Sequence, residues 1–429
     1  MAQVQDDPLF QPLLLSNNGI QLEHRLVLAP LTRNRATEPN LCAHDLHVEY
    51  YSSRATQGGL LITEATNISP EAVGYFSVPG LWTQEQGDAW RRVTDAVHAK
   101  GGKIFCQLWH TGRISQPSFG QHPFLIHSGK PLPSVSASNV TMTHPTTNKP
   151  LSAMTYQGKE ECVAPRALSI EEMPRLIEDY RHAARMALVA GFDGVELHAA
   201  HGYLIDQFIN SGTNLRKDKY GGTIENRCRL LCEVADALCQ IMGPGRVAVR
   251  LSPTTLINGR QNQMYFATKC DDPDQVYHHA VQAMNQFPLA YLLLTEPRWS
   301  SRDDGNPATD KGFLKPLTNG KYRKIYHGTL MAAGGFTPAS AAKAVADGTY
   351  DLVAFGRWYI SNPDLVAKIK DGSDLTVYER ETFYDSTFQG GGKRGYTDYP
   401  KMGEPMGRFH TMKQSDIGIS SSLSSLSKL

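Results

Sequence analysis

The sequence predicts an α/β fold, a single (β/α)8 TIM barrel with inserted loops at the C-terminal face of the barrel. One observation is a set of apolar runs of four to six residues without polar alternation, as is typical of parallel strands covered on both faces. A second is that helical patterns separate several of these runs. A third is the length of 429 residues with 41% hydrophobic content, which is enough for one large barrel.

Eight apolar runs are predicted to be the barrel strands, because eight βα units in succession build this fold. They are bounded by glycines and polar segments, as strands are. The predicted strands occupy residues 26–29, 59–63, 103–108, 193–197, 247–251, 290–294, 329–332 and 352–355.

Helices are predicted between several of these strands from apolar and small residues at helical spacing. Ser169 and Glu172 have the spacing of a capping box and mark the start of one helix, while Gly348 follows the end of another. The predicted helices occupy residues 84–100, 175–190, 224–241 and 338–346.

Three polar stretches, residues 115–167, 254–272 and 302–318, interrupt the simple repeat. Each follows a predicted strand, so each is expected at the C-terminal face, where the active site of this fold lies. They are therefore candidates for a lid or for the rim of a substrate site. Residues 1–400 are predicted to form the barrel, and residues 401–429 a flexible C-terminal tail.

Charge and cysteine content argue against several classes of function. The formal net charge is +1, so the chain has no field that would attract nucleic acid or an acidic membrane surface. No apolar run reaches membrane-spanning length, and the N-terminus lacks the apolar core of a signal peptide. The seven cysteines include no C-x-x-C pair, which argues against a disulfide framework and against a zinc or iron–sulfur site. No metal is predicted.

The C-terminus carries a targeting pattern. The last ten residues are rich in serine and end in Ser427-Lys428-Leu429, the tripeptide that the peroxisomal import receptor reads. A flexible tail would expose this tripeptide at the very end of the chain. The sequence therefore predicts a peroxisomal protein, with the cytoplasm as the alternative location.

Polar side chains that could perform chemistry follow the fourth predicted strand. His198 falls at its C-terminal edge, and His201 and Tyr203 come directly afterwards. Two imidazoles beside a phenol form a compact set of hydrogen-bond donors, suited to binding an oxygen atom and delivering a proton. The structural alternative is that one histidine merely satisfies the end of a strand.

The last two predicted strands end in a pattern typical of phosphate binding in this fold. Glycines let backbone N–H groups approach phosphate oxygens, and an arginine completes the pairing. The ligand would then extend across the barrel mouth toward Arg250, Gln107 and Thr32, which suits a flat phosphorylated cofactor such as flavin mononucleotide (FMN). No GxGxxG pattern follows a strand, so no dinucleotide-binding domain is predicted. The residues of the phosphate pattern are Gly334, Gly335, Gly356 and Arg357.

The chain resembles the old yellow enzymes, which are FMN-dependent ene-reductases, and resembles most the 12-oxophytodienoate reductase branch. The resemblance extends from Leu9 to about Pro400. Its motifs include Ala29-Pro30-Leu31-Thr32-Arg33, His198-x-x-His201-Gly202-Tyr203, Lys219-Tyr220-Gly221-Gly222-Thr223-Ile224-Glu225-Asn226-Arg227, Phe355-Gly356-Arg357 and Gly395-Tyr396-Thr397-Asp398-Tyr399-Pro400.

The resemblance implies a role for each matching residue. His198 and His201 would bind the carbonyl oxygen of the substrate, and Tyr203 would donate the proton. Tyr75, Arg298 and Tyr384 match positions at the rim of the substrate site. The residues implied to bind FMN are Pro30, Leu31, Thr32, Ala65, Gln107, Arg250, Gly334, Gly335, Gly356 and Arg357.

The implied activity is reduction of the C=C bond of an α,β-unsaturated carbonyl compound, with NADPH as the reductant of FMN. Oxylipin cyclopentenones such as 12-oxophytodienoate are one candidate substrate class. The alternatives are a general reductase that detoxifies enones, quinones or nitro compounds, a catalytically silent flavin-binding protein, and a barrel isomerase or aldolase that uses only the phosphate site. The protein would act as a monomer or a homodimer.

Overall fold

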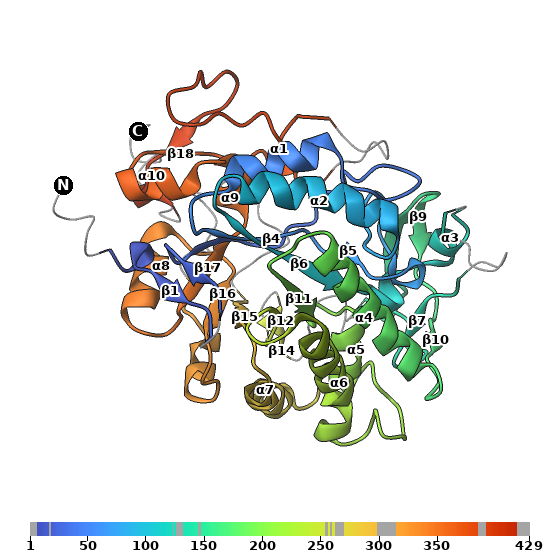
Figure 1. Ribbon diagram of the computed structural model, residues 1–429. Helices are drawn as coiled ribbons and strands as arrows, with labels where there is room; N and C mark the ends of the chain where they lie inside the picture. Colours follow the sequence, from blue (N-terminus) through green and yellow to red (C-terminus); the bar gives the residue numbers. More distant parts are fainter. Residues whose placement is uncertain are drawn as a thin grey trace, which may run out of the picture.

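The computed structural model describes residues 7–16, 19–122, 124–125, 132–144, 147–253, 256–257, 260–261, 270–297, 315–384 and 392–417. Eight parallel strands form one closed barrel with helices around it (Figure 1). The barrel strands are β3 (Leu26–Leu28), β4 (Leu60–Ile62), β6 (Lys103–Trp109), β11 (Gly194–His198), β12 (Val247–Leu251), β15 (Tyr291–Thr295), β16 (Leu330–Ala333) and β17 (Leu352–Phe355).

The pairing of β11 with both β12 and β6 closes the barrel. Around the ring the order is β11, β12, β15, β16, β17, β3, β4 and β6, and the short strand β5 (Thr66–Asn67) continues along β6. All eight predicted strands are confirmed, each end lying within one residue of its predicted position. The predicted (β/α)8 barrel is therefore confirmed.

The interior of the barrel is filled by alternate residues of the strands, since successive side chains of a strand point to opposite faces. Phe105 belongs to this inner cluster of buried side chains. The same cluster includes Leu15 and Leu22, from the hairpin of β1 (Leu13–Leu14) and β2 (Gln21–Leu22). The hairpin thus packs into the end of the barrel where the strands begin.

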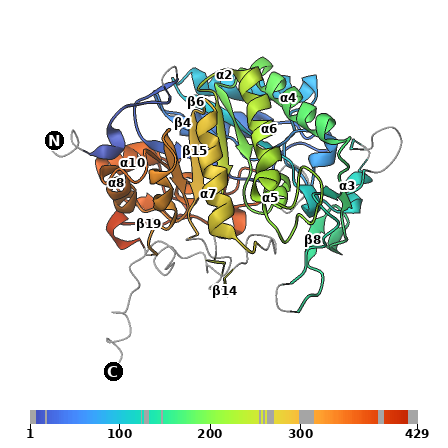
Figure 2. The same cartoon turned by 90° about the horizontal axis from the view of Figure 1, so that it is seen from below.

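Helices cover the outside of the strands and bury an apolar layer against them (Figures 1 and 2). The four predicted helices are confirmed as α2, α4, α6 and α8. The helices are α1 (Asp45–Arg54), α2 (Gln84–His98), α3 (Pro117–Gly120), α4 (Met173–Val189), α5 (Leu204–Ile209), α6 (Ile224–Met242), α7 (Pro273–Ala283), α8 (Pro338–Ala346), α9 (Arg357–Ser361) and α10 (Leu365–Asp371).

The predicted capping box of α4 is only half formed. The carboxylate of Glu172 accepts a hydrogen bond from the backbone N–H of Ser169, at 2.8 Å. The helix itself begins at Met173, and no side chain caps its first turn. The prediction was wrong in this respect because residues 170–172 form a turn, in which the backbone N–H of Glu172 donates to the backbone oxygen of Ser169, at 3.3 Å, and not to its hydroxyl.

The predicted loop 115–167 contains regular structure. It includes α3 and four short strands, of which β8 (Ser152–Thr155) and β9 (Gly158–Glu161) form an antiparallel hairpin. The other two, β7 (Val135–Ser136) and β10 (Arg166–Ala167), pair in parallel. Figure 2 shows β8 on the same side of the molecule as β14 (Arg260–Gln261).

The other two polar stretches are described only at their margins. Of residues 254–272, the structure describes the backbone of β13 (Leu256–Ile257) and β14, together with residues 270–272. Of residues 302–318, it describes 315–318. Their proposed place at the rim of the site stays a prediction.

The C-terminal segment remains packed beyond residue 400, where the tail was predicted to begin. β19 (Thr411–Met412) pairs with β18 (Leu375–Thr376), and Ile417 is buried. The side-chain amide of Gln414 donates to the backbone oxygens of Lys368 and Ser373. These long-range contacts hold residues 401–417, so the predicted boundary was too early.

The tripeptide at 427–429 lies outside the described residues. Within the described part of the chain, no helix is long and apolar enough to cross a membrane.

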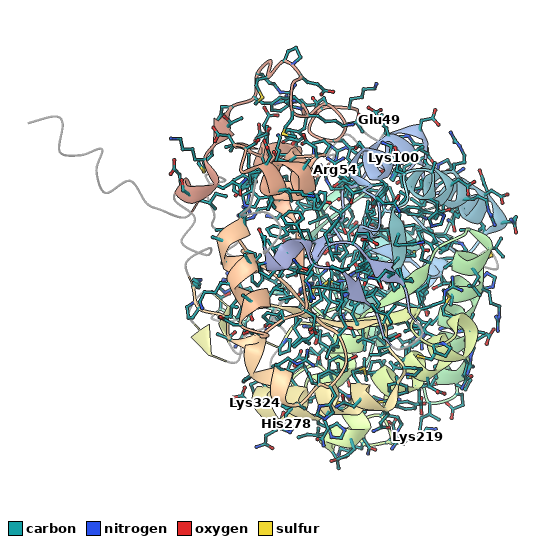
Figure 3. The ribbon with its side chains drawn as sticks, turned by 60° about the vertical axis from the view of Figure 1, so that its left-hand side comes forward. Glu49, Arg54, Lys100, Lys219, His278 and Lys324 are labelled. Atoms are coloured by element: carbon teal, nitrogen blue, oxygen red, sulfur yellow. The ribbon has the colours of Figure 1, made fainter. Side chains whose placement is uncertain are left out.

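Three buried arginines attach the preceding part of the C-terminal segment to the barrel. Arg33 donates to the backbone oxygen of Gly395, and Arg35 donates to that of Thr382. Arg54 donates to the backbone oxygens of residues 359, 360 and 396. In Figure 3, Arg54 lies where the blue N-terminal part of the chain meets the red C-terminal part.

Candidate active site

The centre of the candidate site is the turn between β11 and α5. His198 is the last residue of β11, and Tyr203 directly precedes the first residue of α5. Between them, His201 and Gly202 have φ angles of 58° and 78°. Two successive residues in the left-handed region reverse the chain within one turn. The turn therefore delivers two imidazoles and a phenol to one place, as predicted from their spacing.

The two imidazoles are held by different partners. Nδ1 of His198 accepts from the backbone N–H of Ala200 at 3.3 Å, which places the ring proton on Nε2. Nε2 of His201 shares a hydrogen bond with the Thr295 hydroxyl at 3.1 Å. Burial, together with the nearby charge of Arg250, lowers the pKa of both rings well below the usual value. Both are therefore neutral at neutral pH and able to donate from one nitrogen.

The phenol of Tyr203 packs among aromatic rings. Its ring lies edge-on to Trp109 and to His198, with centroid distances of 4.7 and 4.9 Å. Its hydroxyl is 3.4 Å from the hydroxyl of Tyr75, whose ring stacks on Trp109. Burial raises the pKa of Tyr203 well above its usual value, so the phenol keeps its proton at neutral pH. This is the protonation state that a proton donor needs.

The three predicted rim residues have different outcomes. Tyr75 reaches the site, as its contact with Tyr203 shows. Tyr384 is exposed, with 62% of its surface accessible, yet it lies close enough to contribute to the raised pKa of Tyr75 and of Tyr203. Arg298 lies outside the described residues.

The loop after β3 meets the loop after β17, across the barrel from β11. Ala29 donates its backbone N–H to the oxygen of Phe355, at 3.0 Å. A Cβ added to Gly356 would lie 3.2 Å from Cδ2 of Leu31. The predicted neighbours Pro30 and Thr32 therefore stand next to the predicted phosphate residues. Ala65 packs in a small cluster with Trp109 and Val78, near Tyr75 and Tyr203.

The predicted phosphate residues form a cradle with little room for side chains. Gly334 and Gly335 have φ angles of 111° and 64°, and a Cβ on Gly334 would lie 2.6 Å from the backbone oxygen of Glu296. Successive glycines of this kind turn backbone N–H groups toward an anion. Arg357 lies at the start of α9, and its guanidinium donates to the Tyr378 hydroxyl at 3.1 Å. This donor set fits the phosphate of FMN.

The family of the chain follows from comparison with known proteins. Residues 8–376 match the NADH:flavin oxidoreductase / NADH oxidase family. The chain belongs to this family. Among individual proteins, 12-oxophytodienoate reductase 2 of Arabidopsis thaliana is 40% identical over 403 residues, which cover 93% of this chain and 96% of that protein. A flavin oxidoreductase of Emericella nidulans is 38% identical, with 92% and 97% covered.

Comparison with solved structures agrees with this result. An old yellow enzyme homologue from Zymomonas mobilis superposes with a TM-score of 0.77 at 36% identity, covering 91% of this chain and 99% of that one. Morphinone reductase in complex with tetrahydroNAD gives a TM-score of 0.76 at 37% identity, with 92% and 97% covered. The resemblance to old yellow enzymes is thereby confirmed, and the protein is a flavin-dependent oxidoreductase. A barrel isomerase or aldolase is the wrong alternative.

Sequence reasoning missed the buried carboxylate of Glu196, which contacts the predicted flavin ligand Gln107. The side-chain amide of Gln107 donates to Oε1 of Glu196 at 2.7 Å, and the Tyr291 hydroxyl donates to Oε2 at 2.9 Å. Nε of Arg250 donates to the Thr295 hydroxyl at 3.2 Å. Burial raises the pKa of Glu196. The available signal was a charged residue in the middle of an apolar strand, which requires buried partners.

Proposed function

We propose that the protein is an FMN-dependent ene-reductase that uses NADPH to reduce the C=C bond of α,β-unsaturated carbonyl compounds. The observation that carries this proposal is the placement of His198, His201 and Tyr203 in one turn at the C-terminal end of β11, the end of the barrel at which the glycine cradle also follows its strands. The names of its relatives, which include 12-oxophytodienoate reductases, support the reaction class. The tetrahydroNAD complex of morphinone reductase supports a nicotinamide as reductant.

The side chains of the turn would act on two atoms of the substrate, the carbonyl oxygen and the α-carbon. When bound, FMN supplies the hydride equivalent that it has received from the nicotinamide. Imidazole N–H groups of His198 and His201 hydrogen-bond the carbonyl oxygen, which draws electron density from the double bond and makes the β-carbon electrophilic. Tyr203 then gives its proton to the α-carbon. One hydride and one proton are added, and the carbonyl group is retained.

The flavin side of the site would be held by the chain's own cation and amide. Arg250 would provide a fixed positive charge toward FMN, which would favour the negatively charged reduced state of the flavin. Gln107 uses one N–H group for Glu196, and this bond fixes the orientation of its amide. The glycine cradle and Arg357 would bind the phosphate.

We infer an oxylipin cyclopentenone such as 12-oxophytodienoate as the substrate class. The relatives named for this substrate support it. The aromatic wall of Tyr75, Trp109 and Tyr203 also suits an apolar ring. The alternative is a general reductase, which would reduce many small enones, quinones and nitro compounds with similar kcat/KM. Comparison of kcat/KM between an oxylipin cyclopentenone and these compounds separates the two functions.

Peroxisomal import through Ser427-Lys428-Leu429 is a further part of the proposal, and it rests on the sequence of the tail. A fluorescent protein fused to the N-terminus of the full chain should collect in peroxisomes. Deleting the last three residues should return the fusion to the cytoplasm. Equal distribution of both fusions would refute the targeting role.

The test of the function itself is a visible spectrum of the purified protein under anaerobic conditions. A flavin spectrum should bleach on addition of NADPH and return on addition of cyclohexenone. NADH in parallel gives the preference between the two nicotinamides. A protein that bleaches but is not reoxidised by any enone would refute the ene-reductase proposal while leaving the family assignment intact.

A further inference from the structure

The side chain of Gln207 makes four hydrogen bonds directly behind the catalytic turn. Gln207 lies on α5 and is fully buried. Its Nε2 donates to the backbone oxygens of Gly202, at 2.8 Å, and Thr111, at 3.1 Å. Its Oε1 accepts from the Ser136 hydroxyl, at 2.8 Å, and from the backbone N–H of Arg113, at 3.1 Å. A side-chain amide has two donor hydrogens and two acceptor lone pairs, so all of its capacity is used.

The neighbouring residue Asp206 holds the turn from the other side. Its Oδ2 accepts from the backbone N–H of Gly202 at 2.7 Å, and its Oδ1 accepts from the Tyr277 hydroxyl at 2.6 Å. The N–H of Gly202 belongs to the peptide that follows His201, and its C=O belongs to the peptide that precedes Tyr203. Asp206 therefore fixes the peptide on the imidazole side, and Gln207 fixes the one on the phenol side.

This turn needs to be held in place. His201 has a φ angle of 58°, which a residue with a side chain adopts unfavourably and keeps only where its surroundings enforce it. The backbone N–H of His201 is bound by the Ser252 hydroxyl at 2.8 Å, which holds the entrance of the turn. The exit of the turn, directly before Tyr203, is bound by the Gln207 side chain through the backbone oxygen of Gly202.

We propose that Gln207 is a positioning residue that fixes the phenol of Tyr203 for proton transfer, and that Ser136 extends this control to the inserted segment 115–167. The inference rests on the proposed ene-reductase function. Gln207 contacts three parts of the chain that approach the site: the loop after β6 through Thr111, the inserted segment through Ser136, and the turn through Gly202. A shift of the inserted segment would therefore reach the proton donor through one side chain.

The experiment compares two variants of Gln207 with a matched control. Gln207→Met keeps the length of the side chain and removes all four hydrogen bonds. Gln207→Glu keeps two acceptor oxygens and removes the amide donors. The control is Asn214→Leu, because Asn214 is also a buried amide, whose Nδ2 donates to the backbone oxygens of Phe208 and Tyr220, both at 2.7 Å.

The two half-reactions of the holoenzyme are measured separately by anaerobic stopped flow. Reduction by NADPH needs no proton from Tyr203, so it should stay close to the wild-type rate in Gln207→Met. Reoxidation by cyclohexenone should slow by about 100-fold, the size of effect expected for a misplaced catalytic group. The ratio of reoxidation rates in H2O and D2O should increase, because proton transfer becomes more rate-limiting. In Gln207→Glu, too, reoxidation should slow while reduction by NADPH stays close to the wild-type rate.

A second readout does not depend on turnover. With ring-labelled tyrosine, the signal of Tyr203 should shift in Gln207→Met and stay unchanged in Asn214→Leu. The imidazole signal of His198, whose ring centroid lies 4.9 Å from that of Tyr203, should shift with it. The dissociation constant of FMN, measured from quenching of flavin fluorescence, should be the same in all variants.

The outcomes separate this inference from the proposed function. If the wild-type protein is not reoxidised by cyclohexenone, the proposed function fails. If the wild type is reoxidised but Gln207→Met slows both half-reactions equally, as a general loss of structure would, the positioning role is refuted. If Gln207→Met does not bind FMN, Gln207→Glu and Ser136→Ala provide the test, and wild-type reoxidation rates in both would overturn the inference.

Discussion

The hydroxyl of Tyr203 is the group whose removal should affect the fewest other properties. Tyr203→Phe keeps the ring contacts with Trp109 and His198 and removes the proton donor together with its contact to the Tyr75 hydroxyl. We expect reoxidation by cyclohexenone to slow by about 10²–10⁴-fold, the usual contribution of a general acid, with reduction by NADPH unchanged. The matched control is Tyr180→Phe, because Tyr180 is fully buried and its hydroxyl has no hydrogen-bond partner among the described residues. Equal effects of both substitutions would contradict the assigned role.

Substitution of the single residue Arg357 tests the phosphate cradle. Arg357→Met removes the cation while keeping an unbranched side chain of comparable length. Loss of a charge-assisted hydrogen bond of about 1.5–3 kcal/mol should weaken FMN binding by about 10–100-fold. Riboflavin has the same ring system without the phosphate, so its affinity should not change. Titration of the apoprotein with both ligands, followed by flavin fluorescence, measures the difference, and equal losses for both would place Arg357 elsewhere.

The convergence of His198, His201 and Tyr203 was predictable because polar residues directly follow an apolar strand, and strand ends share one face of the barrel. Gln207 was not predictable in this way. Its partners Thr111 and Ser136 are 96 and 71 residues away in sequence, and nothing local marks them as neighbours. Glu196 gave a local signal, a charge inside an apolar strand, but its partner Tyr291 is also 95 residues away.

At the scale of secondary structure, prediction succeeded where burial dictates the pattern. The eight barrel strands read as apolar runs because both of their faces are covered. The strands of the inserted segment have only two to four residues, and several of their residues are exposed, so alternation could not be recognised. The C-terminal segment is held by hydrogen bonds to its backbone, which leave little trace in side-chain pattern.

The attachment of the C-terminal segment by arginines can be tested by replacing one of them. Arg54→Met leaves the backbone oxygens of Tyr359, Ile360 and Tyr396 without their buried donor. We expect the free energy of unfolding to fall by at least about 2 kcal/mol, because unsatisfied buried carbonyl groups cost about 1–3 kcal/mol each. Urea unfolding measures this change.

The control for this substitution is Arg185→Met, since Arg185 pairs with Glu178 on the exposed face of α4. Surface pairs contribute about 0–1 kcal/mol, so the control should change stability little. Similar losses in both variants would show that the buried arginine has no special role. Hydrogen exchange at residues 392–396 should increase in Arg54→Met alone.

For the whole molecule, buried titratable groups make stability depend on pH with opposing signs. Burial lowers the pKa of His24 from 6.5 to about 4, and raises the pKa of Glu64 from 4.5 to about 7. Between pH 6.5 and 4, the unfolded chain binds a proton at His24 and the folded chain does not, so this histidine lowers stability as the pH falls. Glu64 has the opposite effect, because its folded form binds the proton first.

Comparison of wild type with His24→Gln isolates one of these groups, since Glu64 is present in both proteins. The substitution lowers the free energy of unfolding by a certain amount at pH 7.5. This loss should be about 2 kcal/mol smaller at pH 5, because protonation of His24 in the unfolded chain lowers the stability of the wild type alone. Urea unfolding at both pH values measures the change. His278→Gln, at the exposed surface, is the control for replacing a histidine. A difference independent of pH would mean that His24 titrates alike in both states.

The hairpin of β1 and β2 packs Leu15 and Leu22 into the end of the barrel where the strands begin. A ligand therefore reaches the barrel from the opposite end, where the turn with Tyr203 lies. Under the proposed function, NADPH and the enone would share this entrance, and NADPH would leave before the enone enters. Initial-rate plots of reciprocal velocity against reciprocal NADPH concentration should then be parallel lines at different enone concentrations. Excess NADPH should act as a competitive inhibitor of the enone.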